Sequence, residues 1–213
     1  MKHKLNQIIH ADCMDVMRDI PDKYFELAIV DPPYGIGDFT HNKKERRYKG
    51  TIVTATKFNV YWNNKIPPKE YFMELKRISK DQIIWGANYY NCFKNGSAIV
   101  WYKSIKHPNM SQCEIASYSK GVRVNYVDIE WYSLNRTETT IHPCQKPVAL
   151  YRWLLQNYAK PGDKIIDTHS GSGSCAIACH LEHHDFLAIE KDADYHAASV
   201  ARLDEVRAQG RLF

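Results

Sequence analysis

Residues 164–190 of the 213-residue chain spell KIIDTHSGSGSCAIACHLEHHDFLAIE, and this stretch decides the fold. Its apolar residues predict a buried strand over Lys164–Asp167, a helix over Ser174–Leu181 and a second strand over Phe186–Glu190. A helix that connects two such strands forms a βαβ unit, whose strands run parallel in one sheet. The stretch therefore predicts an α/β fold with a mainly parallel sheet.

The turn between the first strand and the helix contains Gly171 and Gly173. Glycines let the backbone turn tightly and approach a ligand closely, and a helix N-terminus presents unpaired N–H groups. Glu190 ends the second strand, where a carboxylate can accept hydrogen bonds from both hydroxyls of a ribose. The third glycine of a dinucleotide fingerprint is missing, so a nucleoside without pyrophosphate fits better. A glycine turn that binds no ligand is the alternative interpretation.

The rest of the chain also alternates predicted strands with predicted helices, which indicates a doubly wound sheet with an antiparallel part in the middle of the chain. The expected strands are Lys4–His10, Phe25–Val30, Gln82–Trp85, Ser97–Tyr102 and two more within Cys113–Trp131, joined near Lys120 and Gly121. Pro67-Pro68 is expected to open one helix (with Tyr71, Leu75 and Ile78 on one face), and Pro147 is expected to be the first residue of another (with Leu150, Leu154 and Tyr158). A last helix carries Val200, Leu203 and Val206.

Composition limits the kind of protein that this chain can be. With 213 residues and 44% hydrophobic side chains, it has enough apolar material for one domain over residues 1–213. Its first residues are polar and it contains no apolar run of about 18 residues, so we expect neither a signal segment nor a membrane span. Cys175 and Cys179 precede His180, but buried cysteines on a helix are a better interpretation than a metal site. We expect no metal.

The segment Asp31-Pro32-Pro33-Tyr34 follows directly on the predicted strand Phe25–Val30. Ligands of open α/β sheets bind at this end of the strands. The exocyclic amine of adenine or cytosine is a poor nucleophile, and the Asp31 carboxylate and the Pro32 carbonyl can accept its two N–H bonds. Tyr34 can stack on a base that has left the duplex. A stiff turn with a packed tyrosine is the alternative.

These motifs, in this order, resemble those of the β-class, circularly permuted amino-methyltransferases of DNA, the N6-adenine and N4-cytosine family. That family places DPPY before the glycine motif, and a His-Pro-x-Gln-Lys-Pro segment between them resembles residues 142–147, HPCQKP. The resemblance implies a Rossmann-like class I fold that uses S-adenosylmethionine, with a mostly parallel seven-stranded sheet and a permuted motif order. It also implies a cytoplasmic protein encoded by a bacterium or a phage.

The resemblance implies roles for individual residues. Catalysis is expected from Asp31, Pro32 and Tyr34. One departure concerns Thr168 and His169, where the family has Pro-Phe, and from which we expect altered cofactor affinity. Ala11-Asp12-Cys13 resembles the acidic turn near the cofactor adenine. The residues implied in cofactor binding are Asp12, Asp31, Lys146, Asp167, His169, Gly171, Gly173 and Glu190.

Double-stranded DNA is the expected partner. Residues 41–50 contain five basic residues against Glu45 alone, and such a run can neutralise phosphates, although a solvated loop is the alternative. We expect residues 35–64 to form a mobile loop that contacts DNA, and residues 103–141 to form a short target-recognition segment. Because that segment is short, we also expect two subunits to act together. The expected DNA-binding residues are Lys43, Lys44, Arg46 and Arg47.

Asp rather than Ser before Pro-Pro-Tyr favours adenine in the resembled family. We therefore expect methylation of adenine N6 by base flipping, in a restriction-modification or phage-like setting. A cytosine N4 methyltransferase is the first alternative, and a non-catalytic DNA-binding relative is the second. Methyltransferases of protein glutamine or ribosomal RNA carry their glycine motif before the Pro-Pro-Tyr site, which makes them a poor match here.

Overall fold

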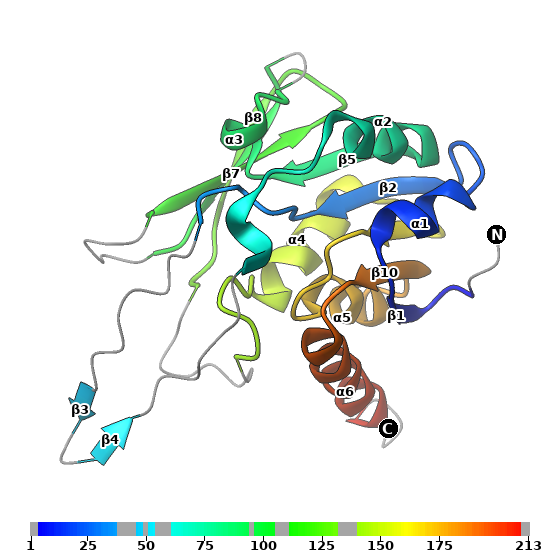
Figure 1. Ribbon diagram of the computed structural model, residues 1–213. Coiled ribbons are helices and arrows are strands. Elements are labelled where there is room, and N and C mark those ends of the chain that lie inside the picture. The colour runs from blue at the N-terminus through cyan, green and yellow to red at the C-terminus, as the bar shows by residue number, and fades with distance from the viewer. Residues whose placement is uncertain are drawn as a thin grey trace.

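The structure of the protein is a computed structural model, which describes residues 4–37, 46–48, 51–53, 61–93, 96–104, 111–131 and 140–209. Of residues 46–48, 51–53 and 61–62 it describes the backbone only. Within these ranges an eight-stranded sheet forms the centre of the molecule (Figure 1). Its strand order is β1-β10-β9-β2-β5-β7-β6-β8. The strands are β1 (Gln7–His10), β2 (Phe25–Val30), β5 (Ser79–Trp85), β6 (Ala98–Tyr102), β7 (Cys113–Tyr118), β8 (Val124–Asp128), β9 (Ile165–Asp167) and β10 (Phe186–Glu190).

Neighbouring strands are parallel from β1 to β5, and only β7 runs antiparallel to its neighbours β5 and β6. The expected Rossmann-like α/β fold is thereby confirmed, but the expectation of seven strands is wrong. The eighth strand, β8, pairs in parallel with the far edge of β6, from Ala98 opposite Val124 to Tyr102 opposite Asp128. It satisfies backbone groups that would otherwise be exposed at that edge. The two strands expected on either side of Gly121 therefore both pair with β6 and not with each other.

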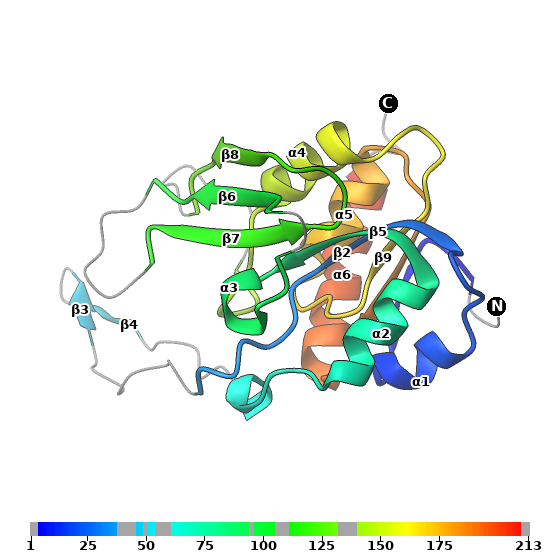
Figure 2. The ribbon, with the colours of Figure 1, turned by 90° about the horizontal axis from the view of Figure 1, so that it is seen from above.

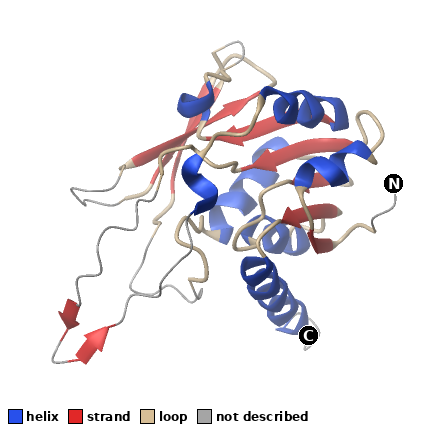
Figure 3. Cartoon of the chain, viewed as in Figure 1, coloured by secondary structure: helices blue, strands red, loops and turns tan. Residues whose placement is uncertain are grey.

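Helices cover both faces of this sheet (Figures 2 and 3). Helices α1 (Cys13–Arg18) and α2 (Lys69–Ile78) contribute to the core on one face, and α4 (Val148–Tyr158), α5 (Ser174–Leu181) and α6 (Ala193–Gln209) to the core on the other. Strand β2 lies between the two cores: Ala28 and Val30 face the first, Leu27 and Ile29 the second. A strand covered on both faces needs a continuous apolar run, which residues 27–30 supply.

Several elements begin at residues other than those predicted. Strand β1 begins at Gln7 and not at Lys4, because Asn6 has a positive φ of 63°, which lies outside the β region. Helices α2 and α4 begin one residue after Pro68 and Pro147, which adopt extended N-cap conformations. The short helices α1 and α3 (Ala87–Tyr90), the 3-10 turn Tyr61–Asn64 and an antiparallel pair of β3 (Arg46–Tyr48) and β4 (Thr51–Val53) were not anticipated. No described helix is both long and apolar enough to span a membrane.

Gly173 is the N-cap residue of α5 and has a φ of 74°. A Cβ atom at this position would lie 3.0 Å from Cβ of Ser199 on α6 and 3.1 Å from Cδ1 of Ile8 on β1. Glycine is therefore required twice here, for its left-handed backbone and for the close approach of α6 and β1. It serves packing and is not among the residues that line the cavity described below, and its contact with the cofactor stays a prediction.

We predict that Gly173→Ala lowers the free energy of unfolding by about 2–4 kcal/mol, the sum of left-handed strain and overpacking. Gly162→Ala is the matched control, since Gly162 also has a positive φ (86°) but nothing lies within 4 Å of its Cβ position. It should lose only the strain, about 1–2 kcal/mol. Urea denaturation of both variants measures the difference. Equal losses would show that packing at Gly173 contributes nothing.

Candidate active site

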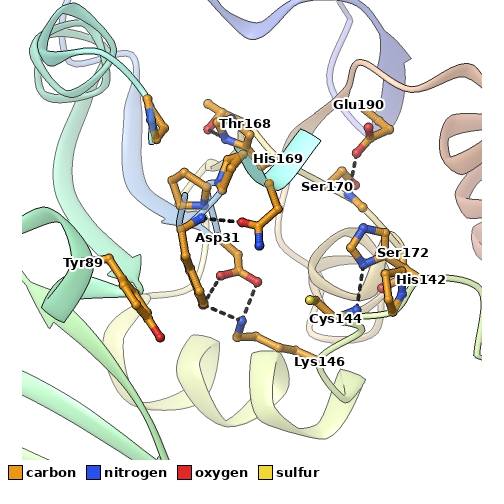
Figure 4. Close-up of a pocket in the computed structure, with 18 of the residues that line it drawn as sticks. Asp31, Tyr89, His142, Cys144, Lys146, Thr168, His169, Ser170, Ser172 and Glu190 are labelled. Carbon is orange, nitrogen blue, oxygen red and sulfur yellow. Dashed lines mark hydrogen bonds and ion pairs between the residues drawn. The ribbon is translucent and has the colours of Figure 1, made fainter. Parts of the chain in front are cut away.

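A cavity of about 1100 Å³ opens at the carboxyl ends of the parallel strands (Figure 4). Strands β1, β2, β9 and β10 end side by side here, so side chains that are far apart in the sequence meet. Asp12 follows β1, Asp31 follows β2, His169 follows β9 and Glu190 ends β10. All four line the cavity, as the order of the strands predicts.

Asp31 forms the charged end of this cavity. Its Oδ1 atom accepts a hydrogen bond of 2.6 Å from the Tyr34 hydroxyl, and its Oδ2 atom forms an ion pair with Lys146 Nζ. Lys146 Nζ also lies 3.2 Å from the Tyr34 hydroxyl oxygen. The predicted residues of two separate motifs, DPPY and HPCQKP, are thus in direct contact (Figure 4).

A second carboxylate, Glu114 of β7, completes this cluster. Its Oε2 atom lies 2.9 Å from Lys146 Nζ and accepts a hydrogen bond of 3.2 Å from Tyr34, and its Oε1 atom lies 2.5 Å from Lys103 Nζ. Burial alone would raise the pKa of Glu114, but Lys146 and Lys103 outweigh burial and hold that pKa at about 2. Burial raises the pKa of Asp31, the attraction of Lys146 opposes that rise, and the charge of Glu114 adds to it.

Neither Glu114 nor Lys103 was predicted to be a site residue. A single glutamate within an alternating strand carries no local signal. Lys103 directly follows the aromatic pair Trp101-Tyr102, but nothing in that short segment indicates a role for its side chain. Only the pairing of β7 beside β5 brings Glu114 to the end of β2.

The Tyr34 ring does not present a free face in the way the stacking hypothesis needs. Tyr89 of α3 stacks on it with ring centroids 4.8 Å apart and an interplanar angle of 15°. A Cβ atom at Gly86 would lie 2.3 Å from the ring, so glycine is required where the ring passes. Burial foremost, and then the charges of Asp31 and Glu114, raise the Tyr34 pKa well above its ordinary value, so its hydroxyl stays a donor.

The Pro32 carbonyl also has a partner. The Tyr90 hydroxyl lies within hydrogen-bond distance of the carbonyl oxygens of both Pro32 and Pro33, the latter at 2.9 Å, and these two acceptors share its single proton. Asn63 accepts a hydrogen bond of 2.8 Å from the backbone N–H of Tyr34. These two segments, together with Lys146, which pairs with Asp31, fix the path of residues 31–34, and the acceptors proposed for a base amine already receive hydrogen bonds from the protein.

The opposite wall of the cavity is built on the glycine turn. The Glu190 carboxylate accepts hydrogen bonds from the backbone N–H groups of Gly171 (2.7 Å) and Asp192 (2.9 Å). Burial is the main cause of the raised pKa of Glu190. Asp12 caps α1 through the Met14 N–H (2.9 Å) and forms an ion pair of 2.8 Å with Lys191, which lowers the Asp12 pKa.

Two neutral histidines complete this wall. Burial lowers the pKa values of His142 and His169 to about 4. The His169 ring lies edge-on to Tyr71, and its Nδ1 atom is 3.0 Å from the Thr168 hydroxyl oxygen. His169 thus presents an uncharged ring to the cavity, where a cofactor contact was expected of it.

Asp167 does not line the cavity, although a cofactor contact was predicted for it. Its side chain turns back to accept a hydrogen bond of 3.1 Å from the His169 N–H, and the residue is 4% exposed. Burial raises its pKa to about 8. Asp167 therefore shapes the turn beneath the cavity.

The protein family of this chain follows from its similarity to known proteins. A model of the N6/N4 methyltransferase family, described as DNA methylase, matches residues 25–201 of the chain. The chain belongs to this family of DNA methylases. The type II methyltransferase M.HinfI of Haemophilus influenzae is 22% identical over 252 residues, which cover 95% of this chain and 69% of that protein.

Two solved structures share the fold of this DNA methylase. The M1.HpyAVI–SAM complex has a TM-score of 0.60 at 20% identity, and the match covers 92% of this chain and 98% of that chain. The cytosine-N4-specific PvuII DNA methyltransferase also has a TM-score of 0.60, at 12% identity, with coverage of 95% and 91%. At these identities the likeness establishes the fold alone.

Family membership confirms the expected activity class, a DNA methyltransferase, and its cofactor, S-adenosylmethionine. The cavity of this methylase fits that cofactor. Both Glu190 oxygens are oriented by backbone N–H groups at a wall of the cavity, and each keeps a lone pair for a ribose hydroxyl. The uncharged His142 and His169 add no positive charge to that wall, which suits a cationic sulfonium.

The side chains of the four predicted DNA-binding residues lie outside what the structure describes. Lys43 and Lys44 lie outside the described residues, and Arg46 and Arg47 belong to β3, of which the backbone alone is described. The described residues contain no group of three or more histidine, cysteine or acidic side chains placed to hold a metal ion.

We predict that Glu190→Ala weakens S-adenosylmethionine binding by at least several-fold, since charge-assisted hydrogen bonds to the ribose are worth about 1.5–3 kcal/mol. Isothermal titration calorimetry of the folded variant measures this loss. Glu182→Ala is the control, because that carboxylate binds Arg152 at the end of α5, away from the cavity lining. An unchanged affinity for Glu190→Ala would remove Glu190 from the ribose site.

Proposed function

We propose that this methylase transfers a methyl group to the exocyclic N6 amine of adenine in double-stranded DNA, on a base flipped out of the helix. The observation that carries the proposal is the Asp31 carboxylate at the cavity, held by Lys146 and the Tyr34 hydroxyl beside the Pro32 carbonyl. An aspartate rather than a serine before Pro-Pro-Tyr supports adenine as the target base.

The chain's own residues orient the amine. The Asp31 carboxylate accepts one N–H and the Pro32 carbonyl the other, which draws the nitrogen lone pair out of conjugation with the ring. When bound, S-adenosylmethionine supplies an electrophilic methyl group on a sulfonium. A nitrogen that gains a methyl group must release one proton, and the Asp31 carboxylate, hydrogen-bonded to that nitrogen, is positioned to accept it. Orientation of this kind supplies much of an enzyme's acceleration.

Because Tyr89 stacks on Tyr34, a flipped base cannot simply occupy that face of the Tyr34 ring. Tyr89 is 42% exposed and lines the cavity. We propose that the flipped base stacks on this aromatic pair, with Tyr89 either as the contacting ring or displaced from Tyr34. Stacking on an aromatic ring contributes about 1–3 kcal/mol per base.

The product of the wild-type protein tests the proposed function. Duplex DNA incubated with S-adenosylmethionine and digested to nucleosides should contain N6-methyldeoxyadenosine, identified by mass spectrometry. N4-methyldeoxycytidine in its place would support the cytosine alternative, for which the same pair of acceptors can hold the amine. DNA and cofactor binding without any methylated base would support the non-catalytic alternative.

We predict that Asp31→Asn lowers the rate of methyl transfer at least about a hundredfold, because an amide cannot take the proton and loses the ion pair with Lys146. Thermal denaturation and cofactor titration should show a folded, cofactor-binding variant. Asp22→Asn, an exposed carboxylate before β2, is the control and should keep the wild-type rate. A near wild-type rate for Asp31→Asn would contradict the proposed role.

We further propose that four basic residues in the segment 35–64 bind DNA phosphates: Lys43, Lys44, Arg46 and Arg47. Residues 103–141 would help to read the target sequence. Two chains would act together on one duplex. Replacing the four basic residues with alanine should reduce the slope of log Kd against log salt, by roughly one unit for each phosphate that the variant no longer neutralises. Binding titrations at several salt concentrations measure the slope, and sedimentation with a duplex gives the stoichiometry. An unchanged slope would assign the run to a solvated face.

A further inference from the structure

Lys103 and Glu114 form a buried ion pair behind the proposed catalytic carboxylate. Their side chains are 8% and 22% exposed, and they come from the end of β6 and from β7. Glu114 and Asp31 share the same two partners, Lys146 and the Tyr34 hydroxyl. This arrangement connects Lys103 to Asp31 through Glu114 and Lys146.

The charges of this cluster balance. Asp31 and Glu114 contribute two negative charges, and Lys103 and Lys146 contribute two positive ones. Without Lys103, the two carboxylates would share Lys146 alone. Without Glu114, Lys146 would face Asp31 alone, beside an excess positive charge. A buried charge is costly unless it is compensated, so each member affects the others strongly.

We propose that Lys103 and Glu114 are positioning residues. Together they hold Lys146 against Asp31, and the Lys103 cation offsets the Glu114 anion, so that Asp31 stays ionised for methyl transfer. The inference rests on the proposed function, in which an ionised Asp31 accepts the N–H bonds of the amine. Neither Lys103 nor Glu114 needs to touch the base or the cofactor.

The direction of each effect follows from the sign of the charge removed. Loss of the Glu114 anion favours the charged form of Asp31 and lowers its pKa, whereas loss of the Lys103 cation leaves an uncompensated anion nearby and raises it. The other titratable side chains around Asp31 are the same in all of these variants. They are Tyr34, Tyr71 of α2, Tyr90 of α3, Cys144 and Lys146 before α4, Tyr151 of α4 and Asp167 of β9.

Two single variants and their combination test this inference. In the cofactor-free protein, the pH titration of the Asp31 side-chain carbon, followed by carbon-13 NMR and assigned with Asp31→Asn, should shift to lower pH in Glu114→Gln. It should shift to higher pH in Lys103→Met, each by about one pH unit. The double variant restores neutrality and should titrate close to wild type. The acid limb of single-turnover methyl transfer should move in the same directions.

Glu26→Gln is a control for the loss of a carboxylate that lies between two lysines. Glu26 lies between Lys80 at 3.0 Å and Lys164 at 3.2 Å, which are more exposed than the lysines beside Glu114. It sits near the start of β2, at the opposite end from Asp31. Glu26→Gln should leave the Asp31 titration and the pH profile unchanged.

Shifts of the same sign in both single variants, or none, would overturn the inference. If Glu114→Gln does not fold, Lys103→Met decides alone, and the absence of an upward shift refutes the proposal. An NMR shift with an unmoved rate profile would also refute it, since methyl transfer would then not depend on Asp31 ionisation. A wild-type protein that makes no methylated base would instead refute the proposed function, and the NMR titration would still test the charge arrangement.

Discussion

The Lys146 ammonium group, buried between the Asp31 and Glu114 carboxylates, places the strongest single constraint on this structure. Removing an ammonium group from water costs several kcal/mol unless opposite charges and hydrogen bonds replace the solvent. The chain must therefore bring the end of β2, the antiparallel strand β7 and the loop before α4 to one point. Removal of either carboxylate would leave a charge imbalance in the interior and lower the stability of the folded state.

The same constraint divides the cavity into two regions of different character. The end near Asp31 is crowded with ionised groups, whereas the wall near the glycine turn carries the uncharged His142 and His169 beside Glu190, with the Asp12–Lys191 ion pair at its margin. Burial keeps both histidines neutral, so these three side chains present negative charge and aromatic surface. A cationic cofactor and a neutral base amine therefore meet where the electrostatic environment changes, at the carboxyl ends of neighbouring parallel strands.

The protein's own donors bind the oxygen atoms that the proposed mechanism uses as acceptors. Tyr34 and Lys146 bind Asp31, and Tyr90 binds the Pro32 carbonyl. This avoids buried acceptors without partners, which are costly. Carboxylate and carbonyl oxygens each have more than one lone pair, so a base amine can join these contacts or replace one of them. In the proposed mechanism this exchange is close to balanced in hydrogen bonds, and we expect specificity to depend on shape and on stacking at Tyr34 and Tyr89.

Local sequence determined much of this protein by itself. The apolar run of β2, the proline-led helices α2 and α4, and the β9–α5–β10 unit with its glycine turn follow from periodicity, proline geometry and glycine, which act within a few residues. The order of DPPY, HPCQKP and the glycine motif indicated the family. Only the tertiary structure decided which strands pair with β6, and that the Asp167 side chain turns back toward its own loop. It also decided that Gly173 is needed for close packing and that Glu114 and Lys103 lie beside Asp31 and Lys146. These depend on which strands lie side by side, and burial and charge compensation between segments far apart in the chain leave no local pattern in the sequence.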